Sequence, residues 1–508
     1  MAKKRGEKLI LTFFDIKKAF NRADMTDMLY IINKEGFNGK VWKLTKSLNE
    51  NLTARVKTKN GLTNEIKREK GGKQGAKLMV PMFSKMMDTL PEEMNQREDL
   101  GVQMGANKIS SLAFVDDILS MAIGYAQQER TLQVVNNFSV IHQLEWGAEK
   151  CKVMEIGTHK ERKTQWDLGE KTITNCSSYK YLGEIISRNG KNAENIKDKL
   201  GKVKAQVIGI VTFARSNIMK KIGTSVMLRM HESVTIPTLL YGSETWILDA
   251  KEMKLVERIE LWALKKMFGL PPTTPTAAIK YITGTYFTEI RIQMKQLMYL
   301  HALLKKENGE LAKEALTTIR DNNVGWAKNI RKILDSWEID KEWNVIATMT
   351  KNAWKKEVEK AAEKRNKIML SEECMIRQRG EEKCKTKTKS ILKILNSPTY
   401  KRQALPILMR LTSIESHALI MGRYEMLDCR ANFSKGYGGK SCEACNVIDD
   451  EMHRVNFCQK YYSINRYDNP EKVDFETIYS DNVHDVRPVI NAILEMWDLE
   501  NGRNKMKL

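Results

Sequence analysis

Short apolar runs that end at acidic residues are the first pattern along this chain. Residues 9–14, LILTFF, stop abruptly at Asp15, and residues 112–121, LAFVDDILSM, are interrupted by Asp116 and Asp117. Runs of this kind predict buried strands, and the second predicts a hairpin with the acidic pair at its tip. Adjacent carboxylates repel each other unless a cation neutralises them, so we predict a divalent-metal seat there. A solvated acidic turn is the alternative.

Capping and turn signals account for the segments between these two runs. Asp24 is a predicted N-cap for a helix, and Asn60-Gly61 predicts a weak hairpin across residues 54–67. The glycine-rich residues 71–75, GGKQG, lead into a predicted helix. Its apolar positions share one face and are Leu78, Met82, Phe83, Met86 and Leu90.

Helical periodicity dominates after residue 192. Positions 196, 200, 203, 207 and 210 are apolar and roughly in phase, which predicts a helical region. A further helix over residues 251–268 ends before Gly269 and Pro271-Pro272, where we predict a domain boundary. No apolar run approaches the roughly 18 residues that a membrane span needs, so we expect no membrane partner.

The net charge of the chain indicates that its partner is a nucleic acid. Its 508 residues suffice for roughly three domains of about 150 residues, and 42% are hydrophobic. The net charge of +22 excludes an ordinary enzyme of small neutral metabolites and indicates a polyanionic partner. Residues 351–410 hold 17 Lys or Arg against 7 Glu, which predicts a phosphate-tracking surface, with a solvated helix face as the alternative.

The cysteines predict a metal site and no disulfide framework. There are eight, and only Cys442 and Cys445 lie close together, which fits a reducing compartment. No secretory signal precedes residue 15, so we expect a nuclear or cytoplasmic protein that is not secreted. Cys442, Cys445, His453 and Cys458 have the spacing C-x2-C-x7-H-x4-C, which predicts one closed, structural Zn²⁺ site. Free thiols are the alternative.

Five blocks in one order resemble the catalytic blocks of reverse transcriptases. They are the strand before Asp15, the loop 71–75, the Val-Asp-Asp hairpin, the lysine-bearing block 144–154 (LEWGAEKCKVM) and the primer-grip-like turn 179–183 (YKYLG). The amino-acid sequences of these blocks are similar to those of non-LTR, LINE-type retrotransposons. The resemblance implies an α+β fold: a right-hand polymerase palm with an antiparallel sheet, followed by a largely helical thumb and C-terminal region with a small zinc module.

The same resemblance implies an RNA-directed DNA polymerase that uses two Mg²⁺ ions, an RNA template, a DNA primer and deoxynucleoside triphosphates. Phe20 would exclude a 2′-hydroxyl, with a core aromatic as the alternative. Lys150 would approach the departing pyrophosphate, although an isolated lysine is more often a solvated surface residue. The implied residues are Asp15, Asp116 and Asp117 for the Mg²⁺ ions, and Gln74 and Gly75 near the incoming base and the template.

We expect four domains: a palm with truncated fingers at 1–190, a helical thumb at 191–270, a basic helical region at 271–425 and a Cys/His module at 426–508. Only 14 residues precede Asp15 and only 50 follow Cys458, so we expect no endonuclease. Two functions remain open: an active polymerase, or a catalytically inactive nucleic-acid-binding remnant of a retrotransposon polyprotein. No pattern indicates an oligomeric state.

Overall fold

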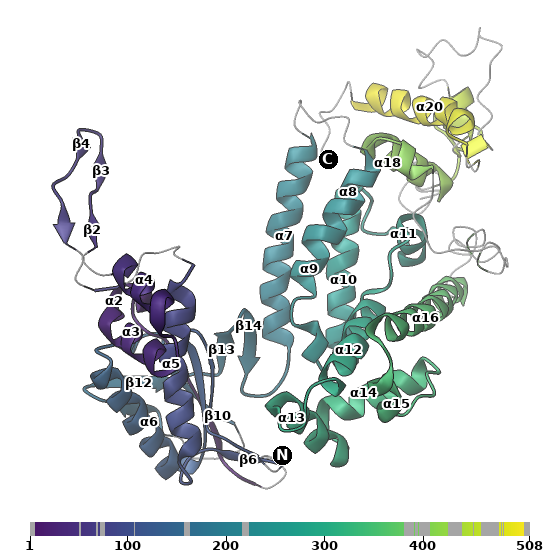
Figure 1. Ribbon diagram of the computed structural model, residues 1–508. Coiled ribbons are helices and arrows are strands. Elements are labelled where there is room, and N and C mark those ends of the chain that lie inside the picture. Colours follow the sequence, from purple (N-terminus) through teal and green to yellow (C-terminus); the bar gives the residue numbers. More distant parts are fainter. Residues whose placement is uncertain are drawn as a thin grey trace. The chain divides into compact units, whose positions relative to one another are not determined.

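The computed structural model describes most of the chain. The described residues are 6–49, 52–67, 70–71, 77–105, 107–156, 163–215, 223–379, 391, 395, 407–424, 439–450, 452–458, 477–478, 480 and 482–501. They form two compact units (Figure 1), and each unit is described by itself. The first unit comprises Met1–Asn195 with Lys306–Val324, and the second comprises Ile196–Lys305 with Gly325–Leu508.

A six-stranded sheet forms the centre of the first unit. Its strand order is β11-β12-β10-β1-β9-β8, and every pair is antiparallel except β10 with β12. The strands are β1 (Leu9–Phe14), β8 (Ser111–Phe114), β9 (Asp117–Ile123), β10 (Lys152–Ile156), β11 (Gln165–Leu168) and β12 (Lys171–Asn175). The predicted strand over residues 9–14 is therefore confirmed, and it lies between β9 and β10.

The central strand β1 is apolar except at Thr12, whose buried hydroxyl accepts a hydrogen bond of 2.7 Å from Nε2 of Gln128 on α6. Ile10 and Phe14 pack into the main core of the unit, and Leu11 and Phe13 pack into a second, smaller cluster on the opposite face. Helices α3 (Met25–Lys34), α5 (Met79–Gln96) and α6 (Gly124–Ile141) supply the main core, and the hairpin of β13 (Ser178–Tyr181) and β14 (Glu184–Ser187) covers the other face (Figure 1). Alternate side chains of a strand point to opposite faces, so a strand covered on both faces is apolar wherever its side chain has no hydrogen-bond partner.

Local signals in the first unit are largely confirmed. Asp24 caps α3, since its side chain accepts hydrogen bonds from the backbone N–H groups of Thr26 and Asp27. The short helices α2 (Ala19–Arg22) and α4 (Gly39–Asn49) complete this part of the unit. The predicted hairpin forms four short strands: β2 (Thr53–Ala54), β3 (Lys57–Thr58), β4 (Gly61–Leu62) and β5 (Ile66–Lys67).

Two expectations of burial were wrong. Leu78 precedes α5 as its N-cap and is 42% exposed, although the other four predicted positions of that face are buried. Phe114 of β8 is 64% exposed, because β8 is the edge strand of the sheet and one of its faces lacks a covering element. The apolar run before Asp116 therefore predicted the strand correctly but not its burial.

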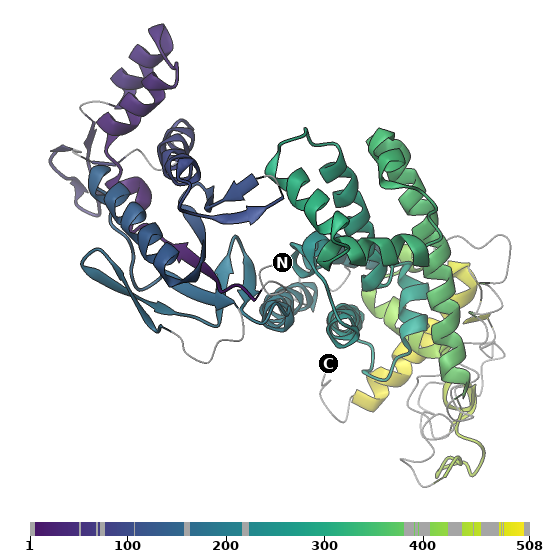
Figure 2. The ribbon, with the colours of Figure 1, turned by 90° about the horizontal axis from the view of Figure 1, so that it is seen from below.

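The second unit is built almost entirely from helices in its described part (Figure 2). They include α7 (Ala193–Arg215), α8 (Thr224–Met230), the π-helix η1 (His231–Thr235), α9 (Ile236–Leu239), α10 (Ala250–Met267), α11 (Thr276–Thr283), α12 (Thr288–Leu304), α14 (Gly325–Ser336), α15 (Trp343–Thr348), α16 (Lys351–Arg379), α18 (Ser413–Arg423) and α20 (Val483–Asn501). The remaining strands and helix are β6 (Val102–Met104), β7 (Asn107–Ile109) and α13 (Leu311–Asp321), in the first unit. The α+β fold class is confirmed. No helix in the described ranges is both long and apolar enough to span a bilayer.

A buried ion network joins four helical segments of the second unit. Glu260 of α10 is fully buried and accepts a hydrogen bond of 2.8 Å from Nζ of Lys280 on α11. The same carboxylate lies 3.4 Å from Nε2 of His231 in η1 and 3.7 Å from Nε of Arg291 on α12. Lys280 also reaches Oε1 of Glu257 at 3.0 Å. Burial raises the pKa of Glu260, but Lys280, His231 and Arg291 outweigh burial and hold it below its ordinary value.

Candidate active site and metal centre

The pairing of β1 with β9 brings together carboxylates that are about 100 residues apart in the sequence. Phe14 pairs with Ile118 in antiparallel register, so the next position, Asp15, faces Asp117 across the two strands. Asp116 lies in the turn between β8 and β9. All three carboxylates are thus placed at one end of the sheet, as the sequence predicts.

The turn that presents Asp116 has a strained backbone. Phe114 pairs with Asp117, which leaves Val115 and Asp116 as a two-residue hairpin loop. Val115 has a φ of 59°, in the left-handed region, where a β-branched residue costs about 1–3 kcal/mol. Its side chain packs against the main core, and this packing holds the residue in place.

Electrostatic crowding at this end of the sheet is compatible with a cation. Burial raises the pKa of Asp117, and the neighbouring charges of Asp116 and then Asp15 raise it further. The three negative charges are therefore close enough to destabilise one another. A divalent cation between them would relieve that repulsion, so the residues present fit the implied Mg²⁺ chemistry.

Residues of the lysine-bearing block 144–154 form hydrogen bonds with the backbone of Asp15. The N–H of Gly147 donates to the carbonyl oxygen of Asp15 at 2.8 Å, and the N–H of Asp15 donates to Sγ of Cys151 at 3.3 Å. Nζ of Lys150 lies 3.4 Å from Oδ2 of Asp15, and the lysine side chain is 65% exposed. Gly147 is a positioning residue that sequence reasoning missed. A Cβ at position 147 would lie 3.0 Å from that same Oδ2 atom, so a side chain there would displace the Asp15 carboxylate.

The hairpin of β13 and β14 borders the carboxylates on the other face of the sheet. The ring of Tyr179 stacks on Phe13 with centroids 4.2 Å apart, and the hydroxyl of Tyr181 donates to the carbonyl oxygen of Asp117 at 3.4 Å. Burial raises the pKa of both tyrosines to about 12, so both are neutral donors at physiological pH. Leu182, at the turn, has a φ of 47°. The YKYLG block therefore lies beside the site, as its place in the order of blocks indicates.

Phe20 and the glycine-rich loop are tied to the same region through α2. The Phe20 ring is half-buried, with its centroid 5.0 Å from that of Phe83 on α5. This packing is compatible with both predicted roles, a core aromatic and a floor for the sugar. Gln74 and Gly75 lie outside the described residues. Gly71 at the start of the loop donates its N–H to the carbonyl oxygen of Ala23 at 2.9 Å.

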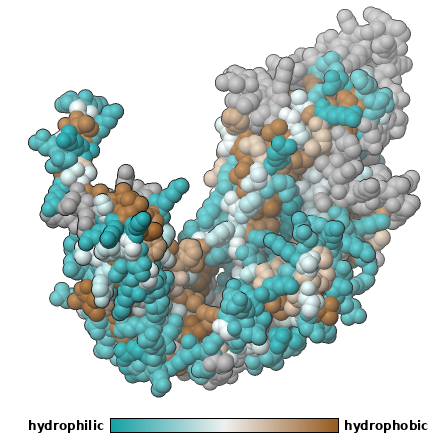
Figure 3. All heavy atoms as spheres, viewed as in Figure 1, coloured by the Kyte–Doolittle hydropathy of each residue, from teal (hydrophilic) through white to brown (hydrophobic). Residues whose placement is uncertain are grey.

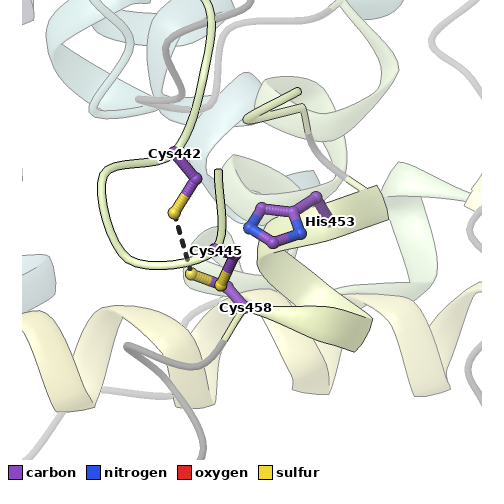
Figure 4. A group of neighbouring side chains, drawn as sticks. All are labelled: Cys442, Cys445, His453 and Cys458. Atoms are coloured by element: carbon purple, nitrogen blue, oxygen red, sulfur yellow. Dashed lines mark hydrogen bonds between the residues drawn. The ribbon is translucent and has the colours of Figure 1, made fainter. Parts of the chain in front are cut away.

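The predicted zinc ligands converge in the second unit. Cys442, Cys445, His453 and Cys458 place one ligand atom each within 4.8 Å of one another (Figure 4), and no other group of three or more acidic, His or Cys side chains in the described ranges does so.

The geometry of the Cys/His group fits tetrahedral zinc. Sγ of Cys442 lies 3.7 Å from Sγ of Cys458, and two thiolates about 2.3 Å from one Zn²⁺ ion in a tetrahedron are about 3.8 Å apart. Nε2 of His453 is buried without a hydrogen-bond partner. Burial raises the pKa of Cys442, but hydrogen bonds, chiefly from His453 and the backbone N–H groups of Ala444 and Cys445, outweigh burial and lower it to about 7. A thiolate is the form that binds zinc.

The chain is similar to known polymerases in sequence. The family model "Reverse transcriptase (RNA-dependent DNA polymerase)" matches residues 1–186. A Pol polyprotein of the type-1 retrotransposable element R2 from Popillia japonica is 22% identical over 334 residues, which cover 62% of this chain and 51% of the relative. An R2 Pol polyprotein from Nasonia vitripennis is 23% identical over 192 residues, covering 36% and 18%. The chain therefore spans about half, or less, of the length of these relatives.

A solved structure of telomerase from Candida albicans, in complex with a TWJ fragment of telomeric RNA, is similar with 13% identity and a TM-score of 0.32. The similarity covers 69% of this chain and 51% of the telomerase chain.

Proposed function

We propose that this chain, whose first 186 residues match the reverse transcriptase family and which is similar to R2 retrotransposon Pol polyproteins, is an RNA-directed DNA polymerase that extends a DNA primer on an RNA template. The observation that carries the proposal is the convergence of Asp15, Asp116 and Asp117 at one end of the sheet. Two Mg²⁺ ions held there would activate the primer 3′-hydroxyl and stabilise the leaving pyrophosphate.

The residues around the carboxylates have distinct roles in this proposal. Asp15 and Asp116 are the principal metal ligands, and Asp117 supports them from the first position of β9. Lys150 neutralises Asp15 at 3.4 Å before substrate binds, and its exposed ammonium group is free to donate a proton or charge to the pyrophosphate afterwards. Phe20 lies under the sugar of the incoming nucleotide. The Cys/His group binds one Zn²⁺ ion and acts structurally.

A second candidate function rests on the pairing of Asp15, whose carboxylate lies 3.4 Å from the ammonium group of Lys150. A protein that kept this arrangement in the presence of Mg²⁺ would bind nucleic acid through its excess of 22 positive charges without polymerising.

Primer extension distinguishes the two candidates. The chain is incubated with a primed RNA template, deoxynucleotides and Mg²⁺, beside Asp116→Asn and the charge-matched control Asp340→Asn at an exposed site of the second unit. We expect wild-type extension, an unchanged Asp340→Asn variant, and a loss of about 10³-fold in Asp116→Asn, since a metal ion supplies several kcal/mol of transition-state stabilisation. Wild-type extension no greater than that of Asp116→Asn would contradict the polymerase and favour the binding protein.

A further inference from the structure

A slender arm, defined as residues 52–67, projects from the first unit between α4 and the glycine-rich loop (Figure 1). Every residue of the arm is exposed except Leu52 and Thr63, which are half-buried. The surface of the arm is mostly hydrophilic, with a small apolar patch near its tip (Figure 3). A projection that buries almost nothing contributes little to folding, so its sequence is free to serve an interaction.

The strand pairing sorts the side chains of the arm onto two faces. Thr53 pairs with Lys67 and Lys57 pairs with Leu62, so Arg55, which alternates with them, lies on their face. Ala54 pairs with Ile66 on the opposite face. The opposite face carries Ala54, Val56, Thr58, Thr63 and Ile66. The first face carries Thr53, Arg55, Lys57, Leu62 and Lys67, with Lys59 at the tip and Glu65 hydrogen-bonded to Thr53. One face is basic and the other is uncharged.

The basic face is electrostatically unsatisfied. None of Arg55, Lys57, Lys59 and Lys67 forms an ion pair with any residue in the described ranges, and Glu65, the one acidic residue of the arm, accepts a hydrogen bond from Thr53. Alternate residues of a strand point to the same side and are about 6.8 Å apart, far enough for two cations to contact different phosphates. Arg55 and Lys57 have this spacing, so both can contact phosphates of one strand at once.

The composition of the arm favours a duplex over a single strand. Residues 52–67 contain no Phe, Tyr, Trp or His, so the arm offers no ring on which an unpaired base could stack. A ribbon with its cations on one face can instead lie along the phosphates of a duplex strand, which requires no contact with the bases.

The foot of the arm is held against α2, which begins four residues after Asp15 in the chain. The chain returns from β5 to Gly71, whose N–H donates to the carbonyl oxygen of Ala23 just beyond α2. A Cβ on Gly71 would lie 2.6–2.7 Å from backbone atoms of Asn21 in α2, so this approach requires glycine. The helix α2 also carries Phe20. A duplex held by the arm therefore extends outward from the end of the sheet that carries the carboxylates.

We propose that the basic face of the arm binds the phosphate backbone of the template–primer duplex and holds it at the active site. The identity of the duplex rests on the proposed polymerase function. The contact itself is electrostatic, so it forms without nucleotides and weakens steeply with salt.

Equilibrium binding of the full chain to a labelled RNA–DNA hybrid duplex tests this, without Mg²⁺ or nucleotides and over a series of salt concentrations. The neutral variant Arg55→Gln/Lys57→Gln/Lys59→Gln is expected to bind about tenfold or more weakly. Its slope of log K against log salt becomes shallower by about 2–3, because about 0.9 counterions are released for each phosphate contact. Because these side chains are exposed, thermal unfolding of the variant stays at the wild-type temperature.

Two matched control variants distinguish an effect of the position of the cations on the basic face from an effect of the net charge of the arm. The swap variant Arg55→Val/Val56→Arg/Lys57→Thr/Thr58→Lys keeps composition and charge but moves two cations to the opposite face, so it should lose affinity as the neutral variant does. The variant Val56→Thr/Ile66→Thr alters only the uncharged face and should bind as wild type. Wild-type duplex affinity in the neutral or the swap variant overturns the proposal, and so does a loss confined to single-stranded RNA.

Failure of the arm and failure of the polymerase are distinguishable. If wild type extends primers and the neutral variant keeps full duplex affinity, the arm proposal alone is wrong. If wild type does not extend primers but neutralisation still weakens duplex binding, the arm proposal holds and the polymerase proposal is wrong.

Discussion

Replacing Lys280 with methionine tests the buried ion network of the second unit. The lysine is 2% exposed, and its Nζ atom contacts Oε2 of Glu260 at 2.8 Å, Oε1 of Glu257 at 3.0 Å and the carbonyl oxygen of Tyr286 at 2.8 Å. Methionine preserves much of the apolar stem but removes the charge. Glu260 keeps Arg291 as a partner, whereas Glu257 loses the one cation it contacts at 3.0 Å.

The size of the effect follows from burial. Removing one partner of a buried ion pair costs about 3–5 kcal/mol, because the remaining charge is left uncompensated. For a denaturant slope of about 2 kcal/mol per molar, a loss of about 4 kcal/mol moves the urea midpoint of the second unit down by about 2 M. Lys266→Met, at an exposed position of α10, serves as the matched control and should change the free energy of unfolding by less than about 0.5 kcal/mol.

The loss of unfolding free energy in Lys280→Met should also depend on pH. Burial raises the pKa of Glu257 and Lys280 opposes that rise, so the variant raises the pKa further. A carboxyl whose folded pKa lies above its unfolded pKa loses stability as pH rises through the folded pKa. The loss of unfolding free energy in Lys280→Met should therefore grow as pH rises above the ordinary glutamate pKa of about 4.3, and adding Glu257→Gln should recover part of it. A defect below about 1 kcal/mol, or one that does not change with pH, would refute this reasoning.

Two further predictions concern the metal sites. Cys445→Ser, or a strong chelator, should release about one Zn²⁺ per chain by metal analysis and lower the unfolding temperature, and zinc affinity should fall as pH drops below about 7, where the Cys442 thiol becomes protonated. Unchanged metal content and stability would mean that the Cys/His group is not a zinc site. Asp117→Asn should raise the unfolding temperature in the absence of divalent cations, because burial, Asp116 and Asp15 all disfavour the charged form of Asp117 and that penalty is present above its raised pKa. The same variant should reduce primer extension, and a lower unfolding temperature at pH 7 would contradict the electrostatic account.

Local features of the first unit were predictable because neighbours in sequence create them. The cap formed by Asp24, the hairpin at Asn60-Gly61 and the apolar strand before Asp15 depend on a few adjacent residues. The ligand spacing of Cys442 to Cys458 was readable for the same reason, since 17 consecutive residues supply the whole site. The predicted domain boundaries within the helical part stay predictions.

Burial and long-range pairing could not be read from the pattern. Phe114 belongs to an apolar run yet is largely exposed, because β8 lies at the sheet edge and nothing in the run records its neighbours. Lys280, by contrast, is a charged residue that is buried. A lone lysine in a helix is normally solvated, and only the packing of α10 places two carboxylates beside it. Gly147 required the β1 backbone beside it before its role became visible.

The sequence by itself determined many of the elements that form, the residues proposed to carry the chemistry, and the resemblance to reverse transcriptases. These properties follow from side-chain type and local periodicity. Only the tertiary structure decided that Asp15 faces Asp117, that Lys150 pairs with Asp15, and that the arm presents one basic and one uncharged face. The reason is physical: sheet register and strand pairing determine distances between residues far apart in the chain, and each depends on the packing of the whole unit.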